Sequence, residues 1–205
     1  MASYPLGYPE APWRLRGQLW VSLFRVTGDA GRPPGRPAGL YGAAFVSYEP
    51  GSELTYSELL VARPVGAGKR PRVSVTDIWV DSPASMAGGR ELWAIPKELC
   101  DFTLDTRHAG PLSRTAWAAS AQGRPIARAL FTDVSRAGVR LPLRAALAQP
   151  GLSGGGPRTA PMRGSARTLP CGARWEFAAD GPLGWLAGRR PVASFRMADF
   201  RLSFG

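Results

Sequence analysis

The sequence predicts a mainly β fold of the α+β class. Residues 1–205 are expected to form one domain, built as a partly closed antiparallel β-barrel or double sheet with a few short helices. Three observations predict this class. First, 25 Gly and 20 Pro separate short apolar runs, which is typical of strands joined by turns. Second, these runs recur about every 8–15 residues, as in β-sandwiches and barrels. Third, no segment of about 20–50 residues repeats, and strands do not alternate with long helices.

Four strands are expected in the first half of the chain. Gln18–Val26 is rich in residues that favour extended backbone. Leu40–Tyr48 follows a Gly/Pro/Arg-rich loop, and Tyr56–Arg63 follows a Pro-Gly-Ser turn. Arg72–Asp81 carries its β-branched residues in near alternation, as a strand with one buried face does.

The second half is expected to add further strands. The segments that predict them are Asp101–Asp105, Arg114–Ser120, Ile126–Asp133, Arg163–Phe177 and Val192–Leu202. Between two of these segments, the Gly/Pro-rich run Pro150–Pro161 predicts a flexible loop. Because β-type segments lie on both sides of this loop, one continuous domain is expected rather than two.

Two short helices are expected. In Ser82–Gly88, Ser82 is a favourable N-cap, and Pro83 occupies the first helical position, where its missing N–H leaves no hydrogen bond unmade. Leu141–Gln149 is the other candidate.

Composition excludes several classes of protein. No apolar stretch reaches about eighteen residues, so no transmembrane helix and no membrane partner are expected. The N-terminus lacks the basic start and apolar core of a secretory signal, so the cytoplasm is the expected compartment. Cys100 and Cys171 are too few and too far apart for a disulfide scaffold or a thiolate metal site. With His108 as its only histidine, the chain cannot use a mechanism that needs a pair of histidines.

Positive charge is concentrated in the second half. Residues 1–105 carry 11 basic and 11 acidic side chains, whereas residues 106–205 carry 15 Arg and 4 acidic residues. The arginines are spaced singly, and no zinc-finger, RNP or helix-turn-helix pattern accompanies them, so nucleic acid is not the expected partner. A solvated basic surface is the simplest interpretation. The alternative is attraction of an anionic substrate or an acidic carrier protein.

One lysine lies in an apolar segment. The chain has two lysines, Lys69 and Lys97, and apolar residues precede and follow Lys97. In an extended strand Lys97 shares a face with Ile95 and Leu99, while Glu98 points the other way. Burial favours the neutral amine, which attacks ketones, and the resulting imine is an electron sink. The alternative is an ordinary surface lysine.

Around this lysine the sequence resembles a known enzyme family. The run Gly88-Gly89-Arg90-Glu91-Leu92, three further residues and Pro96-Lys97 resemble the signature of the acetoacetate decarboxylase family, in which the lysine after the proline forms a Schiff base. Tyr56-Ser57-Glu58 resembles the family's Tyr-Thr-Glu, whose glutamate lies near that lysine. Pro12–Gly17 resembles the start of the family's N-terminal strand.

The resemblance implies a role for each position. Lys97 is the expected imine-forming residue, Glu58 the residue that moves protons, and Arg16 the ligand of a substrate carboxylate, with Arg14 and Arg25 as alternatives. No metal, nucleotide or other cofactor is implied, because the imine itself supplies the electron sink. The expected geometry is a Lys97 amine inside an apolar cavity, within about 6 Å of a Glu58 oxygen.

Four neighbouring residues complete the expected site. Trp93 and Trp79 are expected in the core, where either can form part of the substrate pocket wall. Arg90 and Glu91 are expected to be a structural pair that holds the turn before Lys97.

The sequence also departs from the family pattern. Glu98 stands where family decarboxylases carry a second lysine. Ala43 stands where a second glutamate is expected from the position of Glu58, with Glu49 and Glu53 as alternatives. Because a second lysine keeps the first one neutral, these differences argue against acetoacetate as the substrate.

The expected function is that of a lyase-type enzyme that acts on a keto acid or larger keto compound through a lysine Schiff base, in a biosynthetic pathway. One alternative is a pocket-templated cyclase or small-molecule binding protein without imine chemistry. Another is acetoacetate decarboxylase itself. A small keto substrate is the expected partner, and a homo-oligomer the expected assembly.

Overall fold

The computed structural model describes residues 7–28, 33–34, 36–66, 71–134, 138–152 and 154–205. The strands are β1 Trp13–Val26, β2 Gly39–Tyr48, β3 Tyr56–Pro64, β4 Arg72–Val80, β5 Lys97–Leu99, β6 Asp101–Ala109, β7 Leu112–Ala121, β8 Arg124–Val134, β9 Val139–Gln149, β10 Arg158–Pro170, β11 Gly172–Phe177 and β12 Ala193–Phe204. The helices are α1 Pro83–Trp93 and the short 3₁₀ helix η1 Gly184–Leu186. The predicted mainly β class is confirmed.

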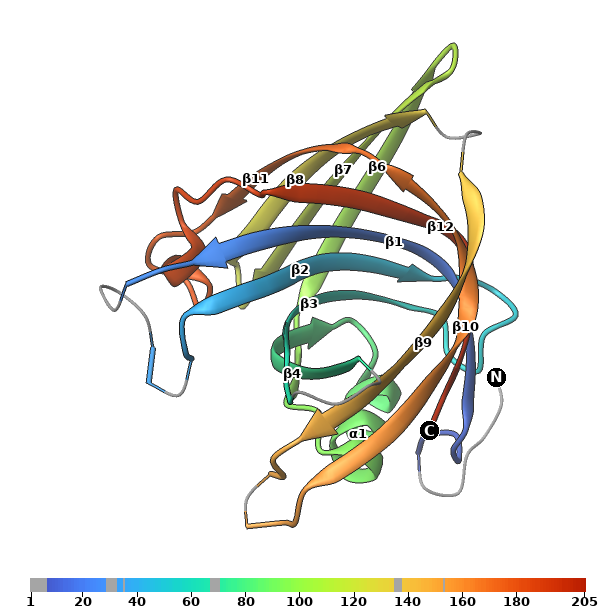
Figure 1. The fold of residues 1–205 in the computed structure, drawn as a ribbon, viewed down its shortest axis with the longest axis vertical. Coiled ribbons are helices and arrows are strands. Elements are labelled where there is room, and N and C mark those ends of the chain that lie inside the picture. Colours follow the sequence, from blue (N-terminus) through green and yellow to red (C-terminus); the bar gives the residue numbers. More distant parts are fainter. Residues whose placement is uncertain (1–6, 29–32, 35, 67–70, 135–137, 153) are drawn as a thin grey trace.

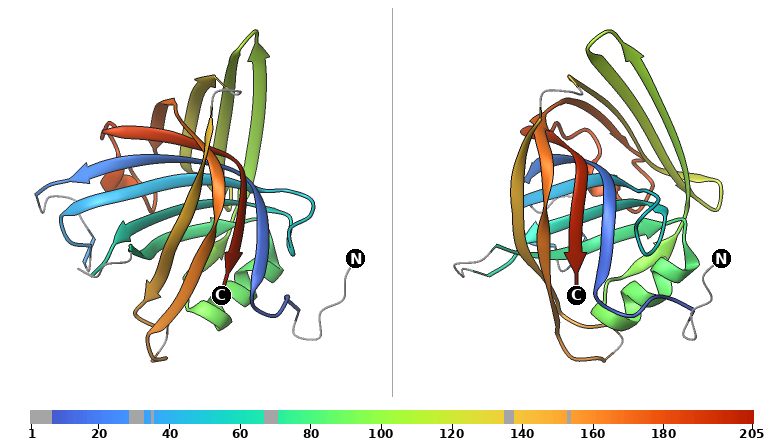
Figure 2. Two further views of the ribbon diagram at one scale, coloured as in Figure 1. Left: turned by 45° about the vertical axis from the view of Figure 1, so that its right-hand side comes forward. Right: turned by 90° about the vertical axis from the view of Figure 1, so that its right-hand side faces the viewer.

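Seven strands in the described ranges close into a barrel (Figure 1). Their order is β4-β3-β2-β1-β12-β10-β9, and β9 returns to β4 through a short parallel pairing at Arg72↔Ala146 and Val73↔Leu147. The other barrel pairings are antiparallel. Strand β5 lies parallel to β4 and brings Lys97 beside Ile78. The views in Figure 2 show α1 lying against the barrel near the C-terminal end of β12.

A second sheet, in the order β11-β8-β7-β6, packs on the outer face of β1, β2 and β3. Side chains alternate along a strand, so these three barrel strands contribute to two cores. Phe45 and Leu59 point outward to the second sheet, whereas Val46 and Glu58 belong to the barrel interior. Burial on both faces explains why parts of these strands, such as Ala43–Val46, carry apolar residues at consecutive positions.

Helix α1 begins as predicted and ends later. Ser82 is its N-cap and accepts a hydrogen bond from the Ser85 backbone N–H, and Pro83 occupies the first position. The predicted end at Gly88 is wrong, because the helix continues to Trp93 and ends at Ala94 in the left-handed conformation. A Cβ on Gly88 would lie 2.7 Å from Trp13 and 2.9 Å from Tyr8, so this glycine lets the helix pack directly on two aromatic rings.

The predicted helix at Leu141–Gln149 is wrong, because this segment is part of β9. It pairs with β10 along its whole length and closes the barrel on β4, so long-range hydrogen bonds decide its conformation. The predicted strand Arg163–Phe177 is two strands, β10 and β11. The predicted loop Pro150–Pro161, whose residue 153 lies outside the described residues, is shorter because β10 begins at Arg158.

No helix of the described ranges combines the length and the hydropathy that a membrane crossing requires.

Candidate active site

The barrel encloses a cavity of about 180 Å³. Aromatic side chains of Trp13, Trp93 and Phe204 form part of its wall, together with aliphatic side chains from β1, β3, β4, β9, β10 and β12. The charged side chains among its described lining residues are Lys97 and Glu58. The cavity is therefore an apolar pocket with one localised charged pair.

The local sequence determines how Lys97 enters this cavity. After α1 ends at Ala94, the chain turns, and the Lys97 backbone N–H donates to the Ile95 carbonyl at 2.8 Å. Arg90 donates from its guanidinium to the Lys97 carbonyl at 2.9 Å, so it holds the backbone of the lysine. A Cβ on Gly89 would lie 2.8 Å from both Cδ and Cε of Lys97. Gly89 thus leaves the space through which the lysine side chain passes along the helix.

The Lys97 amine contacts three polar side chains. Its Nζ lies 3.1 Å from Oε2 of Glu58 and donates to Oγ of Ser85 at 2.8 Å and to the Tyr56 hydroxyl at 3.3 Å. The Lys97 and Glu58 side chains are each 4% exposed. An ammonium has three donors, and these three partners satisfy them.

Glu58 is held from its other side by a second tyrosine. Its Oε1 accepts a hydrogen bond from the Tyr48 hydroxyl at 3.1 Å. The rings of Tyr48 and Tyr56 stack with centroids 4.3 Å apart, because these residues are direct cross-strand neighbours on β2 and β3. A continuous hydrogen-bonded chain therefore runs from Tyr48 through Glu58 to Lys97 and Ser85.

The ion pair changes the expected electrostatics of the lysine. Burial lowers the pKa of Lys97, but the Glu58 carboxylate and the Tyr56 hydroxyl raise it, and the net shift is upward from 10.5. Burial and the nearby Glu58 also raise the pKa of Tyr48 well above 10.0. The expectation that burial leaves Lys97 neutral is therefore wrong for the resting site, in which the lysine is a charged partner of Glu58.

The structure brings some of the predicted residues together. Lys97 and Glu58 lie within the expected distance in an apolar cavity, and Trp93 lines that cavity. Glu98 points away from it, is exposed and accepts a hydrogen bond from Trp79 Nε1 at 3.2 Å. Their catalytic and binding roles remain predictions.

Other predicted residues lie elsewhere. Trp79 is not part of the pocket wall, because it follows the inward-facing Ile78 on β4 and packs in the core between barrel and second sheet. Arg16 is exposed and lines a groove on the outside of the barrel that also includes Arg14. Arg25 is exposed as well. None of the three arginines lines the cavity around Lys97.

Ala43, at the position expected for a second glutamate, and the two alternatives Glu49 and Glu53 do not line this cavity. Ala43 packs in the core between barrel and second sheet. Glu49 and Glu53 are not among the described residues that line the pocket.

Sequence reasoning missed Tyr48 and Ser85. Both have local signals in the sequence. Tyr48 ends a strand that is followed by a turn and then by Tyr56, so hairpin register pairs the two rings. Ser85 lies three residues after the N-cap, on the first turn of α1. Neither signal alone says that these hydroxyls contact Glu58 and Lys97, respectively.

Comparison with known proteins places these features in a family. Residues 34–162, more than half of the chain, match the family model described as Acetoacetate decarboxylase (ADC). No curated protein sequence matches the chain.

Several solved structures share the fold. The enduracididine biosynthesis enzyme MppR, complexed with the condensation product of pyruvate and imidazole 4-carboxaldehyde, is similar with a TM-score of 0.65 and 21% identity over 97% of this chain and 88% of that one. Acetoacetate decarboxylase from Legionella pneumophila is similar with a TM-score of 0.64 and 16% identity over 99% and 88%. An acetoacetate decarboxylase-like enzyme from Sphingomonas wittichii is similar with a TM-score of 0.58 and 17% identity over 97% and 91%.

At these identities the structural likeness concerns the fold, and the family model adds the match in sequence. The chain belongs to the acetoacetate decarboxylase family.

Proposed function

We propose that this protein is a lyase-type enzyme in which Lys97 forms a Schiff base with the carbonyl carbon of a keto compound. The observation that carries the proposal is the buried contact of 3.1 Å between Lys97 Nζ and Glu58 Oε2 inside an apolar cavity. A buried ionisable pair in a cavity is a common feature of sites that transfer protons. Membership of a family of enzymes supports catalysis over passive binding.

Glu58 is placed to activate the amine. A proton moves from the Lys97 ammonium to the Glu58 carboxylate, which leaves a neutral amine and a neutral acid. The amine nitrogen bonds to the substrate carbonyl carbon, and a proton passes from nitrogen to the carbonyl oxygen to give a carbinolamine. Glu58 returns its proton to that hydroxyl, water leaves, and a protonated imine faces a Glu58 carboxylate again.

The protonated imine then stabilises negative charge on the adjacent carbon. Glu58 is the base that removes a proton from this carbon, and the resulting enamine attacks an aldehyde or expels a leaving group. Tyr48, hydrogen-bonded to Oε1 of Glu58 at 3.1 Å, holds the carboxylate in place during these transfers. The structure of MppR with a condensation product of a keto acid and an aldehyde supports a condensation or dehydration in a biosynthetic pathway.

Acetoacetate itself is proposed to be a poor substrate. The residue after Lys97 is a glutamate, so no second ammonium at that position lowers the pKa of the amine. The neutral amine instead arises by proton transfer to Glu58.

Reductive trapping tests the proposal. A ketone or keto acid is incubated with the protein and sodium borohydride, and the reduced adduct is measured by intact mass and mapped by peptide analysis. The expected adduct lies on Lys97 and is absent from Lys97→Arg. Because Lys69 is the only other lysine, Lys69→Arg is a matched control that should retain the adduct.

The outcome also distinguishes the second candidate function. The Lys97 amine is fully hydrogen-bonded in the resting site, which favours a cyclase or binding protein in which the ion pair only shapes the pocket. That function predicts no adduct with any carbonyl compound. An adduct that maps to Lys97 excludes it.

A further inference from the structure

We infer that the cavity selects an uncharged, largely apolar ketone or aldehyde and disfavours a keto acid of the same shape. This inference rests on the proposed function and names its substrate class. It starts from the cavity wall, where the side chains around the Lys97–Glu58 pair are aromatic or aliphatic apart from the hydroxyls of Tyr48, Tyr56 and Ser85.

Strand alternation explains why arginines on the described barrel strands do not reach this wall. On β1, Trp13 and Leu15 line the cavity, and the intervening Arg14 is exposed. On β10 and β12, Met162 and Leu202 line the cavity, whereas the adjacent Arg163 and Arg201 are exposed. Because neighbouring side chains on a strand point to opposite faces, arginines at these positions belong to the outside of the barrel.

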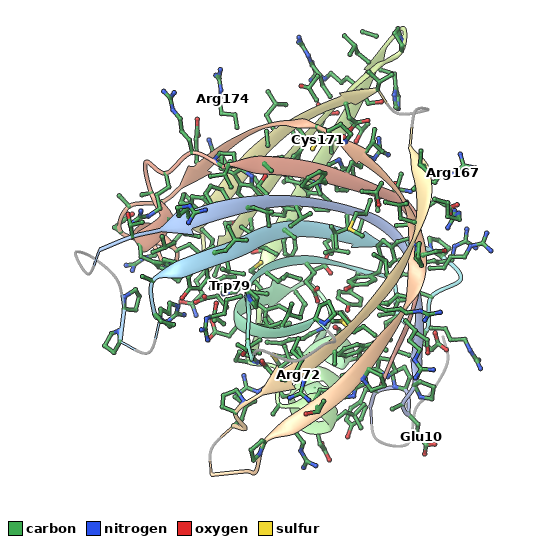
Figure 3. The ribbon with its side chains drawn as sticks, viewed as in Figure 1. Glu10, Arg72, Trp79, Arg167, Cys171 and Arg174 are labelled. Carbon is green, nitrogen blue, oxygen red and sulfur yellow. The ribbon has the colours of Figure 1, made fainter. Side chains whose placement is uncertain are left out.

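Arginines further along β10 and on β11 of the second sheet also point outward. Figure 3 shows Arg167 of β10 and Arg174 of β11 directed outward, away from the barrel and the second sheet. The net positive charge of the second half of the chain is thus carried mainly on the outer surface.

The charge balance of the pocket follows from the chemistry. Before reaction the Lys97 ammonium and the Glu58 carboxylate cancel. After reaction the protonated imine replaces the ammonium, so an uncharged substrate leaves the pocket neutral. A keto acid adds a second carboxylate to a pocket that already holds Glu58, with no further cation among the described lining residues. Burial of an unpaired carboxylate is strongly unfavourable.

The remaining polar contacts do not relieve this cost. Ser85 Oγ and the Tyr56 hydroxyl accept from Lys97, and the Tyr48 hydroxyl donates to Glu58. The Tyr48 and Tyr56 hydroxyls already donate to Glu58, at 3.1 and 3.5 Å, so a substrate carboxylate would have to break one of these hydrogen bonds to accept from a tyrosine. One hydroxyl donor from Ser85 does not offset the cost of burying a charge.

A matched pair of probes tests the inference. 5-Methyl-2-hexanone and 4-oxopentanoate both carry a methyl ketone, and an isopropyl group in the first replaces the carboxylate of the second at nearly the same size. The carboxylate is remote from the carbonyl, so carbonyl reactivity is similar in both. Trapping on Lys97 with cyanoborohydride at neutral pH is measured over a range of probe concentrations. The ketone is expected to react at least about tenfold more efficiently, because its competitor must bury an unpaired charge.

A cation placed in the wall should weaken or abolish the preference. Met162 is half-buried on the cavity wall, so Met162→Arg adds a partner for the carboxylate, while Met162→Gln adds polarity without charge. Met162→Arg is expected to shift the ratio of acid to ketone trapping about tenfold toward the acid, and Met162→Gln to leave it nearly unchanged. Circular dichroism checks that both variants fold.

The possible outcomes separate the two proposals. Equal or better trapping of 4-oxopentanoate by the unmodified protein refutes the selectivity while leaving the Schiff base intact. Absence of an adduct with either probe and with all other carbonyl compounds refutes the proposed function itself. Preference for the ketone in the unmodified protein supports the inference, even where Met162→Arg does not fold.

Discussion

The substitution Gly89→Ala tests whether the helix is shaped to let Lys97 pass. Gly89 lies inside α1, where replacing Gly by Ala ordinarily stabilises a helix by about 1 kcal/mol. Here the added Cβ would lie 2.8 Å from both Cδ and Cε of Lys97. Carbon atoms prefer separations of about 3.5–4.0 Å, so the lysine side chain must move by about 1 Å.

The magnitude follows from these two opposing effects. Overpacking a buried site typically costs about 1–3 kcal/mol, and the helix propensity of Ala offsets about 1 kcal/mol of it. The free energy of unfolding should therefore fall by about 0–2 kcal/mol. The displacement acts directly on Nζ, which is held by Glu58 at 3.1 Å and Ser85 at 2.8 Å. A shift of this size disrupts these contacts and misplaces the amine.

The assay combines urea unfolding with reductive trapping of a ketone on Lys97. Gly89→Ala is expected to unfold at slightly lower urea and to form the adduct at least about tenfold more slowly, as misplacement of a reacting group by about 1 Å predicts. Alanine that stabilises the protein by about 1 kcal/mol and leaves trapping at the wild-type rate would refute the reasoning, since it would mean that Lys97 does not run along the helix.

Three further predictions concern the same segment and its charged pair. Glu58→Gln removes the carboxylate that raises the pKa of Lys97, so the pH at which trapping accelerates should move downward, and an unchanged pH profile would contradict the ion pair. Because the variant leaves a buried charge without its partner, the unfolding free energy measured in urea should also fall by about 3–5 kcal/mol. Folding raises the pKa of Lys97 from 10.5 and the pKa values of Tyr48 and Tyr56 from 10.0, so their contribution to stability is complete below about pH 10 and is lost as the pH rises further. Tyr48→Phe should therefore lose less unfolding free energy than the wild type between about pH 9 and 11. An equal loss in both proteins would argue against the contribution of Tyr48. Ala94 has a φ of 54° at the end of α1, and this conformation costs a non-glycine residue about 1–2 kcal/mol. Ala94→Gly should therefore raise the unfolding free energy by about 1 kcal/mol. A destabilised variant would show that packing of the Ala94 methyl group contributes more than the backbone strain costs.

Local sequence determined much of the fold class and the position of the lysine. Glycine, proline and short apolar runs predict strands and turns because the backbone preferences of these residues act within a few residues. The same holds for the start of α1, where Ser82 and Pro83 act locally. The motif around Lys97 is informative for a related reason: Gly89 and Arg90 contact the side chain or the backbone of the lysine that follows them.

The tertiary structure decided which face of each strand borders the cavity. Strands β1 to β3 are buried on both sides, so alternation alone does not distinguish the barrel interior from the core under the second sheet. Trp79 and Trp93 are equally apolar in sequence, yet only Trp93 lines the cavity. The family resemblance predicted Arg16 as the ligand of a substrate carboxylate, but on β1 its side chain is exposed on the outside of the barrel.

Long-range contacts decided the remaining features. Leu141–Gln149 has no decisive local preference, and pairing with β10 and β4 makes it a strand. The charge state of Lys97 depends on burial and on Glu58 together, and Glu58 is distant in sequence but 3.1 Å away in space. Sequence therefore identified the candidate site residues, whereas folding determined their partners, because hydrogen bonds and electrostatic interactions depend on distance in space and not on separation along the chain.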